Sequence, residues 1–430
     1  MPSAAPRVEL AIRPRPSAAQ VEPPRKLKHA PCTSLPSDSP LSYLEERPAK
    51  RPMPAPSTPT TIAVCNSSGR QAASFIRVAS AVGYHVRAQL RNLDGIVASE
   101  IASLPNVTVL VGDLYIKGTK EVVHETLIKD LFNGADLAFI NTTFWGDEVA
   151  IGKALADAAV AANIKHYIYS SMPDHSKKKP EWPAIPLWSA KYEVETYIRS
   201  LPLLAPRTTY LYTGIYNNNF TSLPYPLFCM ELQSDGSFLW EAPFHPNVPL
   251  PWLDAEHDVG PAVLQLIKDW DKWAGQKIAL AFEMLTPKQA CAAFSRGVRR
   301  PVRYRRTPKI DVKVKIPTGY HNQLLALEKL YNVGKDGKQP PYFGSDRFEQ
   351  SCPEEALALW EGYRGLEEYA KEVFPLEEAA NGLKWMEEDN ILGEVGERGD
   401  DDFDSDNESE GITIGGGTDK PARKEETWLA

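Results

Sequence analysis

The sequence is poor in cysteine. It has five cysteines in 430 residues, and no two of them form a Cys-x-x-Cys pair. Zinc sites and the disulfide frameworks of secreted proteins need cysteines that are paired or closely spaced. Neither is indicated here, no metal site is predicted, and a reducing compartment fits the composition best. The cysteines are Cys32, Cys65, Cys229, Cys291 and Cys352.

Long apolar runs are also missing. No stretch of eighteen consecutive apolar residues occurs, and the N-terminus has no apolar core of the signal-peptide kind. The sequence therefore predicts neither a membrane-spanning helix nor secretion, and no membrane partner is expected.

Apolar residues are scarce at both ends of the chain. Residues 1–60 contain fourteen prolines, and residues 387–410 contain twelve acidic residues against one arginine. Such segments cannot bury enough apolar surface to fold. We therefore expect disordered tails over residues 1–60 and 387–430.

The two tails carry opposite charge. The first has basic clusters at Arg25-Lys26-Leu27-Lys28 and Ala49-Lys50-Arg51-Pro52, which are interpreted either as nuclear-import signals or as a basic linker. With import, the chain would occupy nucleus and cytoplasm. The acidic tail, with Ser405 and Ser409 as candidate phosphorylation sites, either binds a basic partner or only improves solubility. Without the tails the net charge is about −1, so direct binding of nucleic acid is not expected.

Between Thr61 and Met386 the apolar pattern becomes regular. It predicts helices near residues 69–82 and 149–162 between short buried strands. The strands are expected at 61–65, 85–90, 107–111, 137–140, 166–169 and 208–211. Strands alternating with helices indicate βαβ units and a parallel sheet. The fold class is therefore α/β, with a Rossmann-type doubly wound parallel sheet over residues 61–220.

After residue 220 the alternation weakens, and residues 221–386 are expected to form a smaller α/β lobe. Thr286-Pro287 is typical of a helix start, and this helix should continue through Phe294. Short strands are expected at 303–305 and 310–314. A late helix, from Pro353 to about Phe374, should pack on the core through four apolar residues at helical spacing. These are Leu357, Trp360, Tyr363 and Leu366.

The loop after the first strand carries the strongest motif. It reads Asn66-Ser67-Ser68-Gly69-Arg70-Gln71-Ala72. A Rossmann loop needs small residues there, because the backbone turns sharply and helix N–H groups approach a pyrophosphate. Asn66 replaces the first glycine of the usual motif and tolerates left-handed backbone angles, while Ala72 is still small. The loop therefore predicts dinucleotide binding.

Several further segments carry a family resemblance. Together with the loop they closely resemble the fungal nitrogen metabolite repression regulators of the NmrA-like family, over about residues 61–386. The segments are Asn66–Ala73, Phe139–Thr143, His166–His175, Gly214–Phe220, Pro251–Asp258 and the helix near Glu367, Tyr369 and Phe374.

The resemblance implies a function and a set of partners. Members of this family are relatives of short-chain dehydrogenases that bind NAD or NADP and act as regulators. The resemblance implies that this chain is a negative regulator that binds a GATA-type transcription factor. The contact would be with the zinc finger of that factor, with its C-terminal region or with both. Because oxidised nicotinamide is positively charged and the reduced ring is neutral, such a protein could also report redox state.

The resemblance also implies the cofactor contacts. The loop residues Asn66 to Ala72 would hold the pyrophosphate. Arg91 would lie by the adenosine ribose and leave room for a 2′-phosphate, unless it is only a solvated surface arginine. The other implied contacts are Asp113, Leu114, Asn141, Thr142, Thr143, Lys191, Gly214, Ile215, Tyr216 and Asn217.

The residues needed for dehydrogenase chemistry are incomplete. Short-chain dehydrogenases donate a proton from the tyrosine of a Tyr-x-x-x-Lys pair, but Leu187 stands four residues before Lys191. No catalytic residue is therefore assigned, and the chain is expected not to be an enzyme. The alternative is an NADPH-dependent reductase of a quinone or enone with Lys191 as acid. The pairs Asp174-His175 and Glu256-His257-Asp258 are expected to be capping or surface residues.

Overall fold

The computed structural model describes residues 59–116, 122–144, 146–220, 230–311, 318–332 and 339–380. All of them belong to one structural unit that begins at Thr58. Apart from residues 59 and 60, both expected tails, with their basic and acidic clusters, lie outside the described residues.

A seven-stranded parallel sheet forms the centre of this unit, with the strand order β13-β8-β7-β6-β1-β2-β3. The six strands expected from the sequence are confirmed. The strands are β1 (Thr61–Val64), β2 (His85–Leu90), β3 (Val107–Val111), β6 (Leu137–Ile140), β7 (His166–Ser171), β8 (Thr208–Thr213) and β13 (Lys277–Leu280).

Strand β13 was not expected in this sheet. It pairs with β8, with Ile278 opposite Leu211, although the sequence interpretation placed residues 221–386 in the smaller lobe. A boundary at residue 220 therefore does not separate the two parts of the chain. The chain crosses to the smaller lobe after β8 and returns to complete the large sheet.

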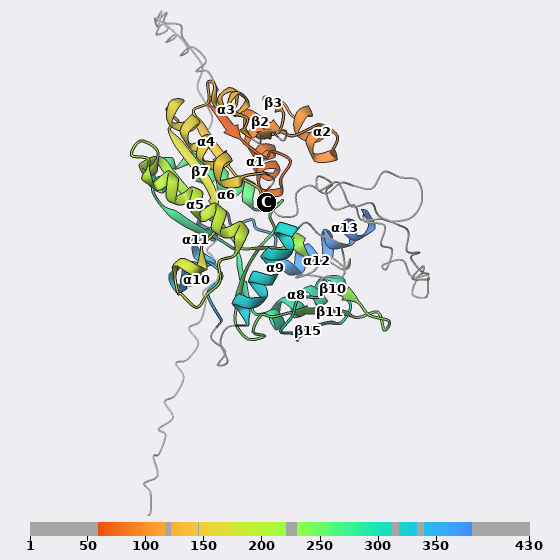
Figure 1. Ribbon diagram of the computed structural model, residues 1–430. Coiled ribbons are helices and arrows are strands. Elements are labelled where there is room, and N and C mark those ends of the chain that lie inside the picture. The colour runs from red at the N-terminus through yellow and green to blue at the C-terminus, as the bar shows by residue number, and fades with distance from the viewer. Residues whose placement is uncertain are drawn as a thin grey trace, which may run out of the picture. The chain divides into compact units, whose positions relative to one another are not determined.

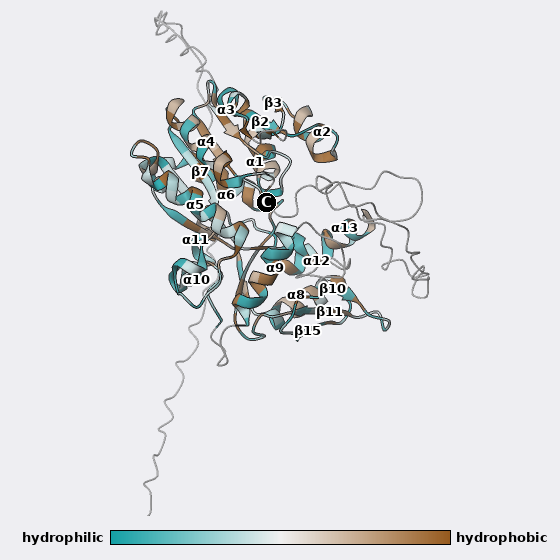
Figure 2. Cartoon of the chain, viewed as in Figure 1, coloured by the Kyte–Doolittle hydropathy of each residue, from teal (hydrophilic) through white to brown (hydrophobic). Residues whose placement is uncertain are grey.

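Helices cover both faces of the sheet, as a doubly wound fold requires (Figure 1). Ile62 and Val64 of β1 face one helical layer, and Ala63 between them faces the other. This alternation follows from the two-residue period of a strand. The first layer contains α1 (Arg70–Ala81), α2 (Ile96–Ser103) and α6 (Val259–Lys268); the second contains α3 (Glu125–Phe132), α4 (Glu148–Ala161) and α5 (Pro186–Ser200). Figure 2 shows α6 as mostly hydrophobic, in agreement with its buried position.

The smaller lobe is built on a three-stranded sheet of β10 (Met230–Leu232), β11 (Phe238–Ala242) and β15 (Val302–Arg306). Its core contains Trp240 and Phe294 and continues to α9 (Thr318–Tyr331) and α12 (Leu366–Glu372). A second small sheet has the strand order β14 (Glu283–Leu285), β12 (Leu250–Leu253) and β9 (Ile215–Tyr216). Its strand β9 follows β8 in the chain after Gly214. Short elements complete the described chain: β4 (Tyr115–Ile116), β5 (Val122–Val123), α7 (Trp270–Trp273), α10 (Asp346–Ser351), α11 (Glu354–Leu359), α13 (Phe374–Ala380) and 3-10 turns at His175–Lys177, Ala205–Arg207 and Asn217–Asn219.

Two expectations for the smaller lobe are confirmed. Helix α8 (Pro287–Val298) begins as expected, because the Thr286 side chain accepts a hydrogen bond from the backbone of Gln289. The Gln289 side chain in turn accepts one from the Thr286 backbone, which completes a capping box. The strand expected at 303–305 is part of β15.

Of two further expectations, one is wrong and one falls mostly outside the described residues. The expected helix from Pro353 to Phe374 is divided into α11, α12 and α13, because Trp360 adopts extended angles and Gly365 begins a new helix. Its apolar residues divide accordingly, with Trp360 packing on the large sheet and Leu366 on the smaller lobe. Of the strand expected at 310–314, Ile310 and Asp311 are not in a strand, and the rest lies outside the described residues.

A buried histidine in the large sheet makes stability depend on pH. His166 of β7 is fully buried, Nε2 lies 2.8 Å from Thr209 Oγ1, and burial lowers the pKa of its ring to about 4. The unfolded chain, with an ordinary pKa near 6.5, therefore binds the proton more readily. This contribution is fully present above pH ~6.5 and is lost as the pH falls toward 4.

Chemical denaturation at pH 7, 6 and 5 tests this dependence. We expect the free energy of unfolding to decrease by as much as about 1.4 kcal/mol per pH unit through this group. His166→Gln should flatten the curve between pH ~6.5 and 4, because the side chain no longer titrates. Equal slopes for the wild-type protein and the variant would show that another group is responsible.

Candidate functional site

The turn between β1 and α1 has the geometry of a dinucleotide loop. Asn66 adopts left-handed angles with φ 53°, as expected for the residue in place of the first glycine. Its N–H donates to the Gln89 side chain at 2.9 Å, and the Ser67 N–H donates to the Gln89 carbonyl at 2.9 Å. Gln89 of β2 therefore fixes the loop, a role that the loop motif alone did not indicate.

The loop leads directly into the N-terminus of α1. Gly69 is the N-cap residue, and it has no side chain that could accept hydrogen bonds from the first turn. The following N–H groups, which have no partner within a helix, point out of its N-terminus. A helix start of this kind attracts an anionic group such as a pyrophosphate.

The side chain of Arg70 connects the loop to distant parts of the chain. It is buried, and Nη1 donates to Glu256 and, at 3.4 Å, to Glu377 of α13. Burial raises the pKa of the Glu377 carboxyl, and the charge of Arg70 opposes that rise. The backbone N–H of Arg70 is therefore the group suited to a phosphate. The guanidinium links α1 to the turn before α6 and to α13.

Except for Lys191, which lies in α5, the remaining expected cofactor residues follow the carboxyl ends of parallel strands. Because these ends meet at one edge of the sheet, the residues gather there although they are far apart in sequence. Half-buried Arg91 follows β2, Asn141 follows β6, and Gly214 follows β8. Asp113 and Leu114 follow β3, Thr142 and Thr143 follow Asn141, and Ile215, Tyr216 and Asn217 follow Gly214.

Some of the buried polar side-chain atoms without partners lie at or beside the same edge. They are Asn66 Nδ2, Gln71 Oε1, and both side-chain amide atoms of Asn141 and of Asn217. Within the described chain these atoms make no hydrogen bond, although unsatisfied buried amides are costly. Asn66, Asn141 and Asn217 follow strands at this edge, and Gln71 lies in the first turn of α1. Their unpartnered atoms fit a polar ligand that lies along the edge, as a dinucleotide would.

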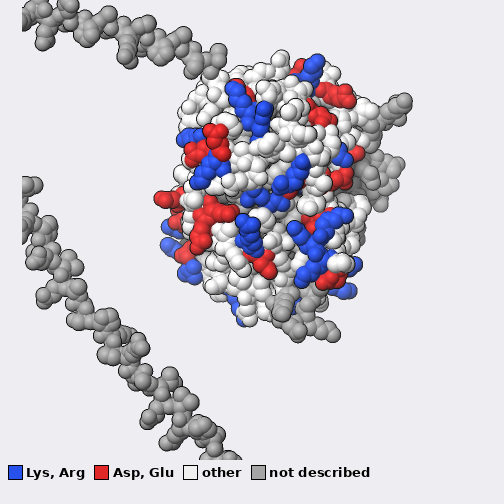
Figure 3. All heavy atoms as spheres, turned by 90° about the vertical axis from the view of Figure 1, so that its left-hand side faces the viewer, with Lys and Arg blue, Asp and Glu red and all other residues white. Residues whose placement is uncertain are grey.

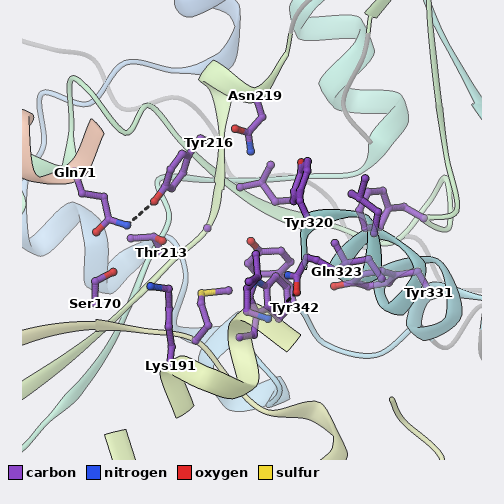
Figure 4. A pocket seen from close by; sticks show the side chains of 18 residues that line it. Gln71, Ser170, Lys191, Thr213, Tyr216, Asn219, Tyr320, Gln323, Tyr331 and Tyr342 are labelled. Carbon is purple, nitrogen blue, oxygen red and sulfur yellow. Dashed lines mark hydrogen bonds between the residues drawn. The ribbon is translucent and has the colours of Figure 1, made fainter. Parts of the chain in front are cut away.

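A cavity of about 130 Å³ continues from this edge toward α9. Figure 4 shows Lys191, Ser170, Thr213 and the hydrogen-bonded pair Gln71 and Tyr216 on one side of the cavity. Tyr320, Gln323 and Tyr331 of α9 lie on the other side. Gly214 lines the cavity where a side chain would not fit, because a Cβ there would come within 2.8 Å of the Pro251 carbonyl oxygen.

Lys191 of α5 reaches this cavity, but its ammonium group is already engaged. Nζ donates to the Thr142 carbonyl and, at 2.9 Å, to Glu148 Oε1. The Thr142 hydroxyl donates to the same carboxylate oxygen at 2.7 Å. Lys191 and Glu148 therefore form a buried ion pair with its own hydrogen-bond partners.

The sequence did not indicate two contacts of this site, that of Glu148 with Lys191 and that of Gln323 with Leu187. Glu148 lies 43 positions before Lys191, in the first turn of α4, where an acidic residue is ordinary for helix reasons alone. Gln323 of α9 accepts a hydrogen bond from the Leu187 N–H at 2.9 Å and thereby caps α5. No spacing rule could have indicated either contact, because each depends on how separate helices pack.

The other charged pairs have structural roles. Asp174 accepts a hydrogen bond from the Ser176 N–H, and His175 Nε2 donates to the Pro341 carbonyl at 2.8 Å. His257 Nδ1 lies 2.6 Å from Asp258, and burial raises the pKa of Asp258 to about 6. Among the described residues no group of three or more His, Cys, Asp or Glu side chains is arranged to hold a metal ion.

Two surface properties complete the description. In the parts of the chain that the structure describes, no helix is long and apolar enough to cross a membrane. On the face shown in Figure 3, basic and acidic side chains are interspersed rather than gathered by sign.

Comparison with known proteins gives consistent matches. The profile of the NmrA-like family matches residues 58–370. The nitrogen metabolite repression protein nmr of Neurospora crassa is 58% identical over 413 residues, which are 89% of this chain and 83% of that protein. Crystal structures of NmrA, described as a negative transcriptional regulator, were solved in complex with NAD and with NADP. Each is 56% identical, covers 76% of this chain and 99% of its own, and has a TM-score of 0.70.

Proposed function

Because the chain belongs to the NmrA-like family, we propose that it is a negative transcriptional regulator of nitrogen metabolite repression that binds NAD or NADP. The observation that carries the cofactor part is the set of buried side-chain amide atoms without partners at Asn66, Gln71, Asn141 and Asn217. These amides line the strand edge at which a Rossmann fold holds a dinucleotide. Close relatives with NAD and NADP complexes support the same cofactor.

The bound dinucleotide serves as a signal or a structural support rather than a substrate. At the position of the usual catalytic tyrosine, Leu187 offers no proton, and it lines the cavity with its apolar side chain. Lys191 is held by Glu148 and the Thr142 carbonyl, so its ammonium is part of a buried ion pair. The charge of the oxidised ring lets such a site report redox state.

The partner of the regulator is a GATA-type transcription factor, bound through its zinc finger or its C-terminal region. Family membership supports this assignment. In this proposal the chain acts in nucleus and cytoplasm and represses by holding the activator, without itself contacting nucleic acid.

Retention of the activator tests this function. The full chain should retain a purified zinc-finger region or C-terminal segment of the activator on a column, and a zinc-stripped finger is the matched control. The same preparation should bind NAD and NADP in calorimetry and should not oxidise NADPH with a panel of quinones and enones. Absence of retention both with and without NAD would contradict the regulator, and NADPH oxidation that Lys191→Ala abolishes would establish the reductase instead.

A further inference from the structure

The charge balance of the cavity depends on two residues. Among the described residues that line the cavity, Lys191 is the only one with a charged side chain. The other lining residues are neutral. Its ammonium is buried, so water screens it poorly. Any ring that enters the cavity next to Lys191 is therefore sensitive to the net charge around that ammonium.

Glu148 lies behind Lys191 and supplies the opposite charge. Its Oε1 is 2.9 Å from Lys191 Nζ and 2.7 Å from the Thr142 hydroxyl, which is itself 3.2 Å from the Tyr169 hydroxyl. Glu148 is 5% exposed and does not line the cavity. It is placed to act on a ligand through its charge and not through direct contact.

We propose that Glu148 is a specificity-determining residue that lets the site accept the oxidised dinucleotide by neutralising Lys191. This inference rests on the proposed binding of NAD or NADP. The oxidised nicotinamide ring carries a positive charge and the reduced ring is neutral. With Glu148 present, the ring meets a neutral ion pair; without it, the oxidised ring alone would meet an uncompensated ammonium.

The affinity ratio between NADH and NAD is the property that this proposal predicts. Glu148→Gln keeps the shape of the side chain and its ability to accept from Thr142, but removes the negative charge. We expect the variant to bind NAD about tenfold more weakly, which corresponds to about 1.4 kcal/mol, while NADH affinity changes less than twofold. Calorimetric titration of the full chain with each dinucleotide measures both values.

Two variants separate the charge effect from damage to the fold. Removal of both charges in the double variant Lys191→Met with Glu148→Gln should return the NADH to NAD ratio to within about threefold of the wild-type ratio. Glu195→Gln is the matched control, because Glu195 is also a buried glutamate, paired with Lys277 at 2.8 Å, and it does not line the cavity. That control should lower stability without changing the ratio.

The outcomes distinguish this inference from the proposed function. An unchanged ratio of NADH to NAD affinity in Glu148→Gln would overturn the role of Glu148, whether both affinities fall equally or neither changes. A wild-type chain that prefers neither form would remove redox reporting, whereas a tenfold change of the ratio in Glu148→Gln would still support the role of Glu148. A wild-type chain that binds neither dinucleotide would overturn both.

Discussion

Replacement of Asn66 by valine is expected to weaken NAD binding by thirty- to one hundredfold, which corresponds to about 2–3 kcal/mol. Asn66 has a φ of 53° in the turn that leads into α1. Left-handed angles cost an ordinary L-residue about 1–2 kcal/mol, and a branched Cβ adds to the crowding. Valine also removes Nδ2, one of the unpartnered buried atoms at the strand edge.

Calorimetry with the full chain measures the affinity, and Asn66→Gly is the matched control. Glycine adopts the left-handed angles without strain, so this variant should keep the loop and lose only the amide. Its affinity for NAD should be at most about fivefold weaker than that of the wild-type protein, which corresponds to a loss of about 1 kcal/mol in binding free energy. Equal, large losses in both variants would show that the amide matters more than the backbone angle.

The loop and most of the large sheet were accessible from the sequence because their signals are local. A buried strand followed by Asn66 and Gly69 and then by an amphipathic helix identifies the first βαβ unit within a few residues. The apolar runs that became β2, β3, β6, β7 and β8 are each bounded by polar turns. Local periodicity is sufficient for such elements.

The parts that were missed depend on tertiary packing. The four residues of β13 carry no signal that distinguishes an edge strand of the large sheet from a strand of the smaller lobe. The break between α11 and α12 was missed because Trp360 and Tyr363 keep helical spacing, although Trp360 is extended and the chain between the two bends and is not helical. Spacing shows which residues are apolar, but it does not show that they pack against different cores.

The charged groups of the site were missed for the same reason. The loop motif predicts that the backbone at Arg70 lies by the pyrophosphate, but it does not predict that the guanidinium contacts Glu256 and Glu377, 186 and 307 positions later. Glu148 likewise meets Lys191 only because α4 packs beside α5. A sequence pattern assigns a residue to a loop, whereas the direction of a long side chain is set by the whole fold.

Gly260→Ala is expected to lower the free energy of unfolding by about 3 kcal/mol, the largest stability effect that we predict. Gly260 of α6 donates its N–H to Ser74 Oγ of α1 at 2.9 Å. A Cβ at Gly260 would lie well under 3 Å from the Ser74 carbonyl oxygen, and a backbone atom within a helix cannot move aside as a flexible side chain can. The two helices must therefore separate, although alanine is the better helix former by about 1 kcal/mol.

The matched control is Gly319→Ala in α9, where an added Cβ meets nothing within 4 Å among the described residues. That variant should be as stable as the wild-type protein or slightly more stable, by up to about 1 kcal/mol. Urea denaturation measures both, and equal midpoints for the two variants would contradict the close approach of α1 and α6.

Because α1 begins at the dinucleotide loop, a displaced α1 should also weaken NAD binding in Gly260→Ala at temperatures where the variant is still folded. Full stability loss with wild-type NAD affinity would show instead that α6 moves and α1 stays with the sheet.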